Sequence, residues 1–319
     1  MDRHKERQNE KSEMDGMLII ENKTEFHLQE KSAVALGKFD GIHLGHRELL
    51  NRVLEQKEKG FSTVVFTFDT SAASFFGGEE KALSTREEKR AVFARIGIDV
   101  LIEFPLNRET AATEPVDFIS RYLTDQMQTA YLCAGPDISF GKGGAGDYAL
   151  LARCAKDYGY QVELIDKVRV DGEEVSSTRV REAVRDGRME EVCKMLGAPY
   201  SVSGRVVHGR RLGRTLGMPT ANLIPAEEKL LPPNGVYYAR GIVDGKVYRA
   251  ISNVGYKPTV SKERILGIET YLYDFDGEIY DSEIQVELLA FRRREQTFDN
   301  VEALRCQIAE DVEAGSTWR

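Results

Sequence analysis

Residues 33–46 read Ala33-Val34-Ala35-Leu36-Gly37-Lys38-Phe39-Asp40-Gly41-Ile42-His43-Leu44-Gly45-His46. The apolar start predicts a buried strand, the glycines predict a turn that a ligand can approach closely, and the end predicts a helix start. A helix start favours a phosphate, because unpaired backbone amides and the positive end of the helix dipole meet there. His43 and His46 are three residues apart and can donate to the same phosphate. The alternative is a glycine-rich turn followed by two ordinary surface histidines.

This strand, turn and helix begin a longer pattern in the first half of the chain. The helix is expected over His46 to Lys59, with Gly60 as its stop. Short apolar runs that alternate with helical periods are typical of a doubly wound parallel sheet, an α/β Rossmann-like domain. The predicted strands are Ala33 to Leu36, Thr63 to Phe68, Val100 to Phe104, Tyr131 to Ala134 and Gln161 to Ile165.

The second half has a different pattern. A helical segment runs from Ser176 to Gly197, and the extended segments after it predict an antiparallel β-barrel. Asp244-Gly245 and Asp276-Gly277 each predict a hairpin. A closing helix is expected to start with Asp299 as N-cap and Glu302 in a capping box. Its predicted apolar stripe is Val301, Leu304, Ile308 and Val312, and the predicted barrel strands are Tyr200 to Val207, Val236 to Val243, Val247 to Val254, Ile265 to Tyr273 and Ile284 to Phe291.

Length and composition set the broad class. A chain of 319 residues with 41% hydrophobic and 30% charged residues is expected to form two globular domains. The net charge of −8 argues against a nucleic-acid or anionic-membrane binder. Four widely spaced cysteines suggest neither a disulfide framework nor a zinc site. Residues 1–16 are expected to be a disordered tail, and without a secretion signal or membrane segment the protein is expected in the cytoplasm.

Two further clusters are suited to phosphate. Ser176-Ser177-Thr178-Arg179-Val180-Arg181 lies at a predicted helix start, where hydroxyls and guanidiniums can hold a triphosphate. By itself it is equally a good N-cap before a basic solvated turn. The stretch from Gly135 to Asp147, which contains Asp137, is otherwise a glycine-rich surface loop.

The run Ser203-Gly204-Arg205-Val206-Val207-His208-Gly209-Arg210-Arg211-Leu212-Gly213-Arg214-Thr215-Leu216-Gly217-Met218-Pro219-Thr220-Ala221-Asn222 is the most specific signal. Its glycines recur every four residues between arginines, which suits a loop whose backbone wraps phosphates. Pro219 favours an extended chain, so Thr220 and Asn222 should project to one face of a strand. A hydroxyl and an amide oxygen there suit Mg²⁺ held jointly with ATP phosphates. A Pro-Thr turn capped by Asn is the simpler alternative for those three residues.

Taken in order, these motifs resemble the bacterial bifunctional riboflavin kinase/FMN adenylyltransferase (FAD synthetase) family over roughly residues 17 to 319. The resemblance implies an adenylyltransferase domain over 17–186 and a riboflavin kinase domain over 187–319. It implies ATP, riboflavin, FMN and FAD as substrates and products, with Mg²⁺ as cofactor and a monomer or weak homo-oligomer. The residues it implies are His43, His46 and Glu269 for catalysis; Gly37, Phe39, Asp40, Gly41, Asp137, Ser177, Thr178, Arg181, Gly209, Arg210, Gly213, Arg214 and Thr215 for ATP; Asn253, Arg292, Arg294 and Phe298 for the flavin; and Thr220 and Asn222 for the metal.

The sequence departs from the family after the second predicted strand. There the family carries Asp-Pro-His-Pro, whereas this chain has Asp69-Thr70-Ser71-Ala72. The change keeps open a riboflavin kinase whose first domain no longer adenylylates FMN. A non-catalytic flavin- or nucleotide-binding regulator is the other alternative, although it would have no need of a general base such as Glu269.

Overall fold

The computed structural model describes residues 12–14, 16–70, 75, 77–78, 80–208, 218–258 and 264–318. The chain forms two compact units. The first comprises the residues through Glu80 together with Arg86–Glu174, and the second comprises Lys81–Thr85 together with Val175 onward. The chain therefore enters the second unit briefly at Lys81, returns to the first, and leaves it for good after Glu174.

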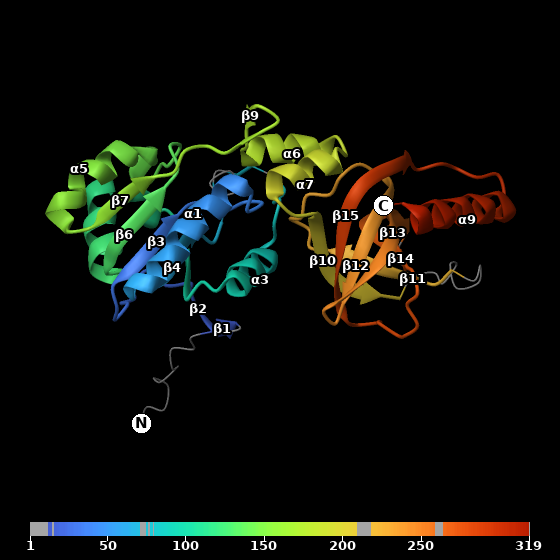
Figure 1. Ribbon diagram of the computed structural model, residues 1–319, viewed down its shortest axis with the longest axis horizontal. Helices are drawn as coiled ribbons and strands as arrows, with labels where there is room; N and C mark the ends of the chain where they lie inside the picture. The colour runs from blue at the N-terminus through green and yellow to red at the C-terminus, as the bar shows by residue number, and fades with distance from the viewer. Residues whose placement is uncertain are drawn as a thin grey trace, which may run out of the picture. The chain divides into compact units, whose positions relative to one another are not determined.

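The first unit is built on one seven-stranded sheet with the order β1-β2-β5-β4-β3-β6-β7 (Figure 1). All neighbouring pairs are parallel except β1–β2. The predicted doubly wound parallel sheet is thus confirmed. Its strands are β1 (Ser12–Met14), β2 (Met17–Glu21), β3 (Ser32–Leu36), β4 (Ser62–Phe68), β5 (Val100–Phe104), β6 (Thr129–Ala134) and β7 (Gln161–Leu164).

Helices cover both faces of this sheet. One face packs on α1 (Leu44–Glu55) and α3 (Arg86–Ile96), through residues such as Leu50 and Phe93. The other face packs on the π-helix η3 (Phe118–Gln126) and on α5 (Tyr148–Tyr158), through Ile119 and Leu151. The central strands β3 and β5 are buried along their whole length, because side chains of both faces meet helices.

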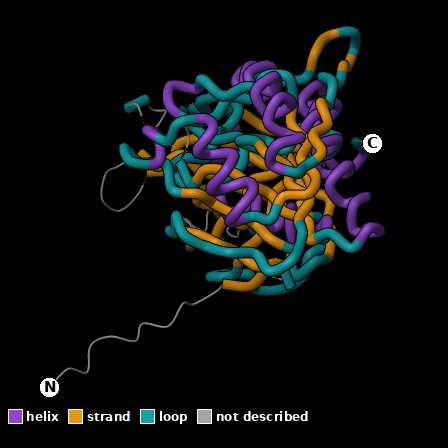
Figure 2. Tube along the Cα trace, turned by 90° about the vertical axis from the view of Figure 1, so that its left-hand side faces the viewer, coloured by secondary structure: helices purple, strands orange, loops and turns teal. Residues whose placement is uncertain are grey.

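Some elements of the first unit were not predicted from the sequence. Ser12–Met14, within the expected disordered tail, form β1 and pair with β2, and the partly buried Met14 packs on the core. A short hairpin of β8 (Arg169–Val170) and β9 (Glu173–Glu174) stands clear of the other strands (Figures 1 and 2). Smaller helical segments are η1 (Gln56–Lys59), η2 (Thr110–Ala112), α4 (Pro115–Asp117) and η4 (Lys142–Gly144).

The second unit is a closed antiparallel barrel with the order β10-β11-β14-β13-β12-β15, as the sequence predicted. Two helices precede it, α6 (Ser177–Arg185) and α7 (Met189–Leu196), which ends at Gly197 with a left-handed φ of 67°. The helix α9 (Val301–Thr317) follows the barrel. The barrel strands are β10 (Tyr200–Val207), β11 (Thr220–Pro225), β12 (Gly235–Val243), β13 (Lys246–Pro258), β14 (Arg264–Leu272) and β15 (Glu283–Arg294).

Of the two predicted hairpins, one is confirmed and one is wrong. Asp244 and Gly245 join β12 to β13 with φ values of 48° and 75°, the left-handed pair that a tight turn requires. Asp276-Gly277 does not make a hairpin, because β14 pairs with β11 and β13 whereas β15 pairs with β10 and β12. The barrel closes because β15 pairs with β10 and β12, which are distant from it in sequence.

The start of α9 also differs from the prediction. Asn300, and not Asp299, is the N-cap, and its side chain accepts a hydrogen bond from the Ala303 amide at 2.8 Å. Val301, placed on the apolar stripe by its spacing, is 60% exposed, because the helix contacts the barrel mainly through its last turns. The four cysteines are all unpaired, as expected.

Candidate active sites

The first candidate site lies where the strand order reverses. The chain continues from β3 to β4 on one side, whereas β6 lies on the other side of β3. In open α/β sheets, ligands bind at the carboxyl ends of the two strands that flank such a point. Residues 37–45, here called the glycine loop, follow β3, and the predicted loop with Asp137 follows β6. The Asp137 side chain is 77% exposed and binds Lys167 at 2.8 Å.

The glycine loop turns its apolar side chains inward. Phe39 and Ile42 are buried at 0% and 3% exposure although both have left-handed φ values, 52° and 42°. Gly37 makes room for the Phe39 ring, because a Cβ there would lie 3.2 Å from it. The predicted phosphate-binding residues Asp40 and Gly41 stay partly exposed on this loop. The backbone between the buried side chains is therefore left to face a ligand.

His43 and His46 meet as the sequence predicted. Their rings stack at 3.8 Å with a tilt of 17°, and His43 caps α1 by accepting the His46 amide at its Nδ1 over 3.4 Å. That bond leaves the proton of a neutral His43 on Nε2, which can donate to a phosphate. Among the described residues, His46 Nδ1 is buried without a hydrogen-bond partner.

Burial keeps both imidazoles uncharged. It lowers the pKa of His43 to about 4 and, with smaller contributions from the charges of His43 and Lys89, lowers the pKa of His46 well below 6.5. Both rings are therefore neutral hydrogen-bonding groups at pH 7. A site that holds them neutral offers directed donors to a phosphate without a fixed positive charge.

Asp69 precedes the run in which the sequence departs from its family. Residues at and just after the end of β5 hold it in place. Its carboxylate accepts the Leu106 amide at 3.0 Å, and its own amide donates to the Phe104 carbonyl at 3.0 Å. Residues 71–74 lie outside the described residues. The effect of the altered run therefore stays a prediction.

The predicted cluster on α6 belongs to the second unit. Ser176 caps this helix by accepting the Arg179 amide at 3.2 Å. Ser177 is half-buried and Thr178 exposed, whereas Arg181 is 7% exposed and its guanidinium donates to the Lys81 carbonyl. The hydroxyls are placed at a helix start as predicted, but the guanidinium of Arg181 contacts backbone within its own unit.

The second candidate site is a row of polar side chains across three barrel strands. Asn222 on β11, Glu269 on β14 and Asn253 on β13 are directly opposite one another in register. Residues opposite each other in neighbouring strands share a face, so these three side chains lie side by side. The flanking residues Ile268 and Thr270 are fully buried on the other face, as the alternation predicted. Because Ile268 and Thr270 face the interior, the Glu269 side chain lies on the outer face of β14.

Thr220 completes this polar row. It lies two residues before Asn222 on β11, on the same face. Its hydroxyl donates to Glu269 Oε1 at 2.5 Å. Thr220, Asn222, Asn253 and Glu269 were predicted from separate parts of the chain for three different roles, and the barrel brings them together.

Glu295 extends the row. A Cβ on Gly255 would lie 1.9 Å from Glu295 Oε1 and 3.3 Å from Asn253 Nδ2, so the carboxylate rests on the bare backbone of Gly255 beside Asn253. Asn234 Nδ2 donates to Glu295 Oε2 at 3.1 Å. The only sequence signal for this contact is a glycine two residues after Asn253.

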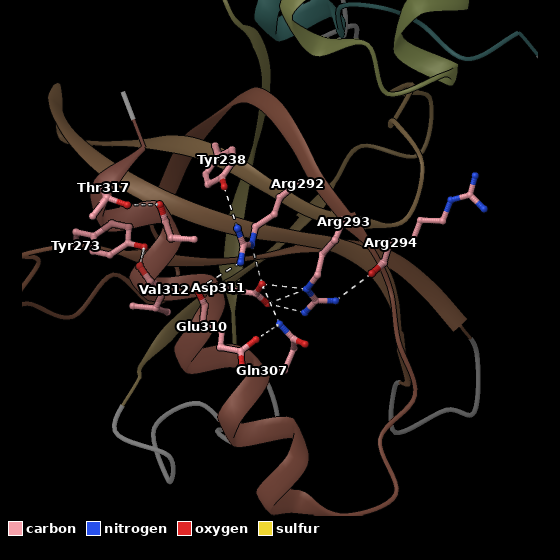
Figure 3. Close-up of polar contacts among 11 residues, drawn as sticks. Tyr238, Tyr273, Arg292, Arg293, Arg294, Gln307, Glu310, Asp311, Val312 and Thr317 are labelled. Carbon is pink, nitrogen blue, oxygen red and sulfur yellow. Dashed lines mark hydrogen bonds and ion pairs between the residues drawn. The ribbon is translucent and has the colours of Figure 1, made fainter.

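The predicted flavin-binding arginines lie at the end of β15, where a register shift interrupts the alternation of side chains. Arg292 and Arg293 therefore both reach Asp311 of α9, with Nε–Oδ1 distances of 2.9 Å in each case (Figure 3). Arg292 also donates to the Tyr238 hydroxyl at 2.9 Å. Arg294 points away from this cluster and is exposed, and Phe298 is half-buried after the strand.

The remaining predicted ATP ligands Gly209, Arg210, Gly213, Arg214 and Thr215 lie outside the described residues. Within the described ranges, no group of three or more His, Cys, Asp and Glu side chains is arranged to hold a metal ion. A cation at Thr220 and Asn222 would therefore depend on oxygen atoms of a ligand as well as on the protein, which is how Mg²⁺ is usually held beside phosphates. In the part of the chain that the structure describes, no helix has the length and apolar character to span a bilayer.

A helix start at the switch point of a parallel sheet, and a carboxylate among hydroxyl and amide groups on a barrel, are the arrangement typical of a two-unit nucleotide-dependent transferase. Family models agree with this division: residues 25–179 match FAD synthetase and residues 196–318 match riboflavin kinase. The chain belongs to the bifunctional riboflavin kinase/FMN adenylyltransferase family.

Curated relatives carry that name and align along most of their length. The protein of Listeria monocytogenes is 34% identical over 87% of this chain and 89% of its own. Those of Escherichia coli K12 and Bacillus subtilis are 34% and 32% identical, each over 89% of this chain and 91% of the relative. A solved structure described as a macrolide-efflux protein from Streptococcus pneumoniae is 30% identical, with a TM-score of 0.84 over 95% of this chain and 100% of that one.

Proposed function

We propose that the second unit phosphorylates riboflavin to FMN with ATP, and that the first unit joins FMN to AMP from a second ATP, giving FAD. The observation that supports the proposal is the row Asn222, Glu269 and Asn253 with Thr220 bonded to the carboxylate, because a carboxylate lies there among groups suited to phosphate and metal. The similar Streptococcus pneumoniae structure is described as a macrolide-efflux protein, which is a different function. The family models for FAD synthetase and riboflavin kinase, which match residues 25–179 and 196–318, support the proposal.

In the kinase reaction, Glu269 accepts the proton of the ribityl 5′-hydroxyl. The hydroxyl oxygen then bonds to the γ-phosphorus of ATP, the bond from that phosphorus to the bridging oxygen breaks, and ADP leaves with the electron pair. Thr220, which donates to Glu269 Oε1, keeps the carboxylate oriented. Asn253 and Glu295 border the same face and are placed to hold the polar part of the flavin substrate.

The oxygen atoms of Thr220 and Asn222 fit Mg²⁺, which prefers few protein ligands combined with substrate phosphates. When bound, the ion would neutralise charge on the phosphates of ATP. Thr220 and Asn222 would hold it, and Glu269 lies one hydrogen bond away.

In the adenylyl transfer, an oxygen of the FMN phosphate bonds to the α-phosphorus of ATP and pyrophosphate leaves. No covalent enzyme intermediate is needed, so positioning and charge stabilisation supply the catalysis. The amides of the glycine loop and the Nε2–H of His43 face the transferring phosphoryl group. Asp137 is proposed for the remainder of the nucleotide, and Ser177 and Thr178 stay predicted ATP ligands.

The test is a Glu269→Gln variant of the full chain, incubated with riboflavin, ATP and Mg²⁺ before the flavins are separated. The unaltered protein should form FMN and then FAD. The variant should form FMN at least about 10²-fold more slowly, because a glutamine keeps the shape but accepts no proton. Supplied with FMN, the variant should still form FAD at the normal rate.

Glu283→Gln is the matched control, because Glu283 is exposed at the start of β15. A normal FMN rate in Glu269→Gln would contradict the base assignment, whereas no FMN from the unaltered protein would favour a non-catalytic flavin- or nucleotide-binding protein. If the unaltered protein accumulates FMN and no FAD, the alternative of a riboflavin kinase with an inactive first domain is correct. The same separation therefore distinguishes all three functions.

We also propose domain limits of 17–186 and 187–319, and a protein that works in the cytoplasm as a monomer or weak homo-oligomer without binding nucleic acid. The net charge of −8 supports the last point. Sedimentation of the purified protein with and without ATP and riboflavin tests the oligomeric state.

A further inference from the structure

The helix α3 packs directly on the glycine loop. Phe93 of α3 meets the Phe39 ring edge-on at 5.6 Å, and Phe39 in turn contacts the His46 ring at 5.1 Å. Lys89 lies four residues before Phe93 and therefore projects from the same face of the helix. This lysine was not among the residues predicted from the sequence.

The charge of Lys89 acts on the residues of the first site. Its charge contributes to the low pKa of His46, after burial and the charge of His43. Burial lowers the pKa of Lys89 itself, and the carboxylates of Asp40 and Glu103 oppose that lowering. Lys89 thus interacts electrostatically with both parts of the proposed phosphate site, the loop and the helix start.

Two other charges on α3, those of Arg86 and Arg90, are already matched. Glu103, 2% exposed, accepts Arg86 Nε at 2.7 Å and Arg90 Nε at 3.2 Å. Glu21 accepts Arg90 at 2.6 Å and lies 3.3 Å from Arg86. Two arginines thus balance two carboxylates without help from Lys89.

Lys89 has no such fixed partner. Within the described ranges it makes neither a hydrogen bond nor an ion pair, although it is only partly exposed. A desolvated ammonium without a fixed partner is costly unless a ligand supplies the counter-charge. A phosphate bound at the glycine loop, near Asp40 and His46, would supply this counter-charge.

We propose that Lys89 binds phosphate oxygens of ATP in the first unit and stabilises the charge that moves onto pyrophosphate as FMN attacks the α-phosphorus. This inference rests on the proposed adenylyl transfer. Lys89 stays protonated throughout and transfers no proton; it acts as a compact point charge on a flexible stem. The charge of Asp40 attracts the ammonium towards the glycine loop before ATP arrives.

The test compares Lys89→Gln and Lys89→Arg in the full chain, with FAD formation from FMN measured against ATP concentration. We expect Lys89→Gln to lower kcat/KM for ATP by about 10²-fold, with an effect on kcat, since the charge matters most in the transition state. Lys89→Arg should recover part of the loss because it keeps the charge. Formation of FMN from riboflavin is an internal control for folding and should change less than about twofold.

Lys31→Gln, an exposed lysine of the same unit, is the matched control. If Lys89→Gln forms FAD at the control rate, the inference is wrong. It is also wrong if Lys89→Arg recovers nothing and both variants lower FAD formation and FMN formation equally. If the unaltered protein forms no FAD, the proposed adenylyl transfer fails instead. Hydrogen exchange of amides 37–46 then still tests Lys89: ATP should protect them in the unaltered protein and in Lys31→Gln, but not in Lys89→Gln.

Discussion

His43 shows how burial decides the chemistry of a single residue. Its pKa is about 4 in the folded protein and 6.5 when the chain is unfolded, because burial disfavours the charged ring. The unfolded chain therefore binds more protons between these two values. The contribution of the neutral His43 ring to the free energy of unfolding is fully present above about pH 6.5, and it is lost as the pH falls towards 4.

We expect the shifted pKa of His43 to lower the free energy of unfolding of the first unit by about 2 kcal/mol as the pH falls from 7 to 5. His43→Gln should remove that part of the pH dependence, whereas His27→Gln, at an exposed position, should leave it unchanged. Hydrogen exchange of the buried β3 and α1 amides at the two pH values measures the difference. An equal pH dependence in His43→Gln and the unaltered protein would contradict the assignment.

At the scale of elements, a buried carboxylate helps to hold the helix α9 on the barrel. Asp311, 5% exposed, accepts hydrogen bonds from Arg292 and Arg293 of β15 (Figure 3). Near the end of the helix, Trp318 stacks on Tyr238 at 4.8 Å, and Gly315 leaves room for the Tyr273 hydroxyl. Arg292 is thus held in the position where the family resemblance expects a flavin contact.

Asp311→Ala should destabilise this docking by about 3 kcal/mol, because it leaves two partly buried guanidiniums without their carboxylate. Trp318 is the only tryptophan of the chain, so its fluorescence reports the event. We expect its emission to shift towards that of a solvated indole and the rate of FMN formation to fall. Glu313→Ala, at an exposed position on the same helix, is the control; an unchanged emission in Asp311→Ala would show that α9 docks without the ion pair.

At the scale of the whole molecule, the second unit includes a piece of the first half of the sequence. The Ala82 amide donates to the Glu228 carbonyl at 2.6 Å, and the Leu230 amide donates to the Ala82 carbonyl at 2.8 Å. Lys229 Nζ donates to the Leu83 carbonyl at 2.7 Å while lying over the Tyr200 ring at 4.4 Å. Leu83 itself is completely buried. The kinase unit is therefore not a simple C-terminal segment.

Leu83→Ala should lower the stability of the second unit by about 3 kcal/mol, although the residue precedes most of the first unit in sequence. Urea unfolding followed by Trp318 fluorescence should show an earlier transition. Val116→Ala, 45% exposed in the first unit, should not move it. A shift confined to hydrogen exchange of the β3 amides, with the Trp318 transition unchanged, would contradict this assignment.

Local sequence was enough to predict most elements of the protein and several parts of its candidate sites. Hydrophobic periodicity and glycine stops depend on neighbouring residues, so β5, the end of η1 at Gly60 and the turn at Asp244-Gly245 were all predictable. The meeting of His43 with His46 was predictable for the same reason, because three residues on a helix define the contact.

Which distant residues meet is a property of the folded chain as a whole. Register across the barrel aligns Asn222, Glu269 and Asn253, and the closing strand β15 brings Glu295 to Gly255. Barrel closure also overruled the local hairpin signal at Asp276-Gly277, and burial, not sequence, sets the neutral state of His43. Pairings between distant strands and the solvation of a side chain depend on the packing of the whole chain, which no short window of sequence contains.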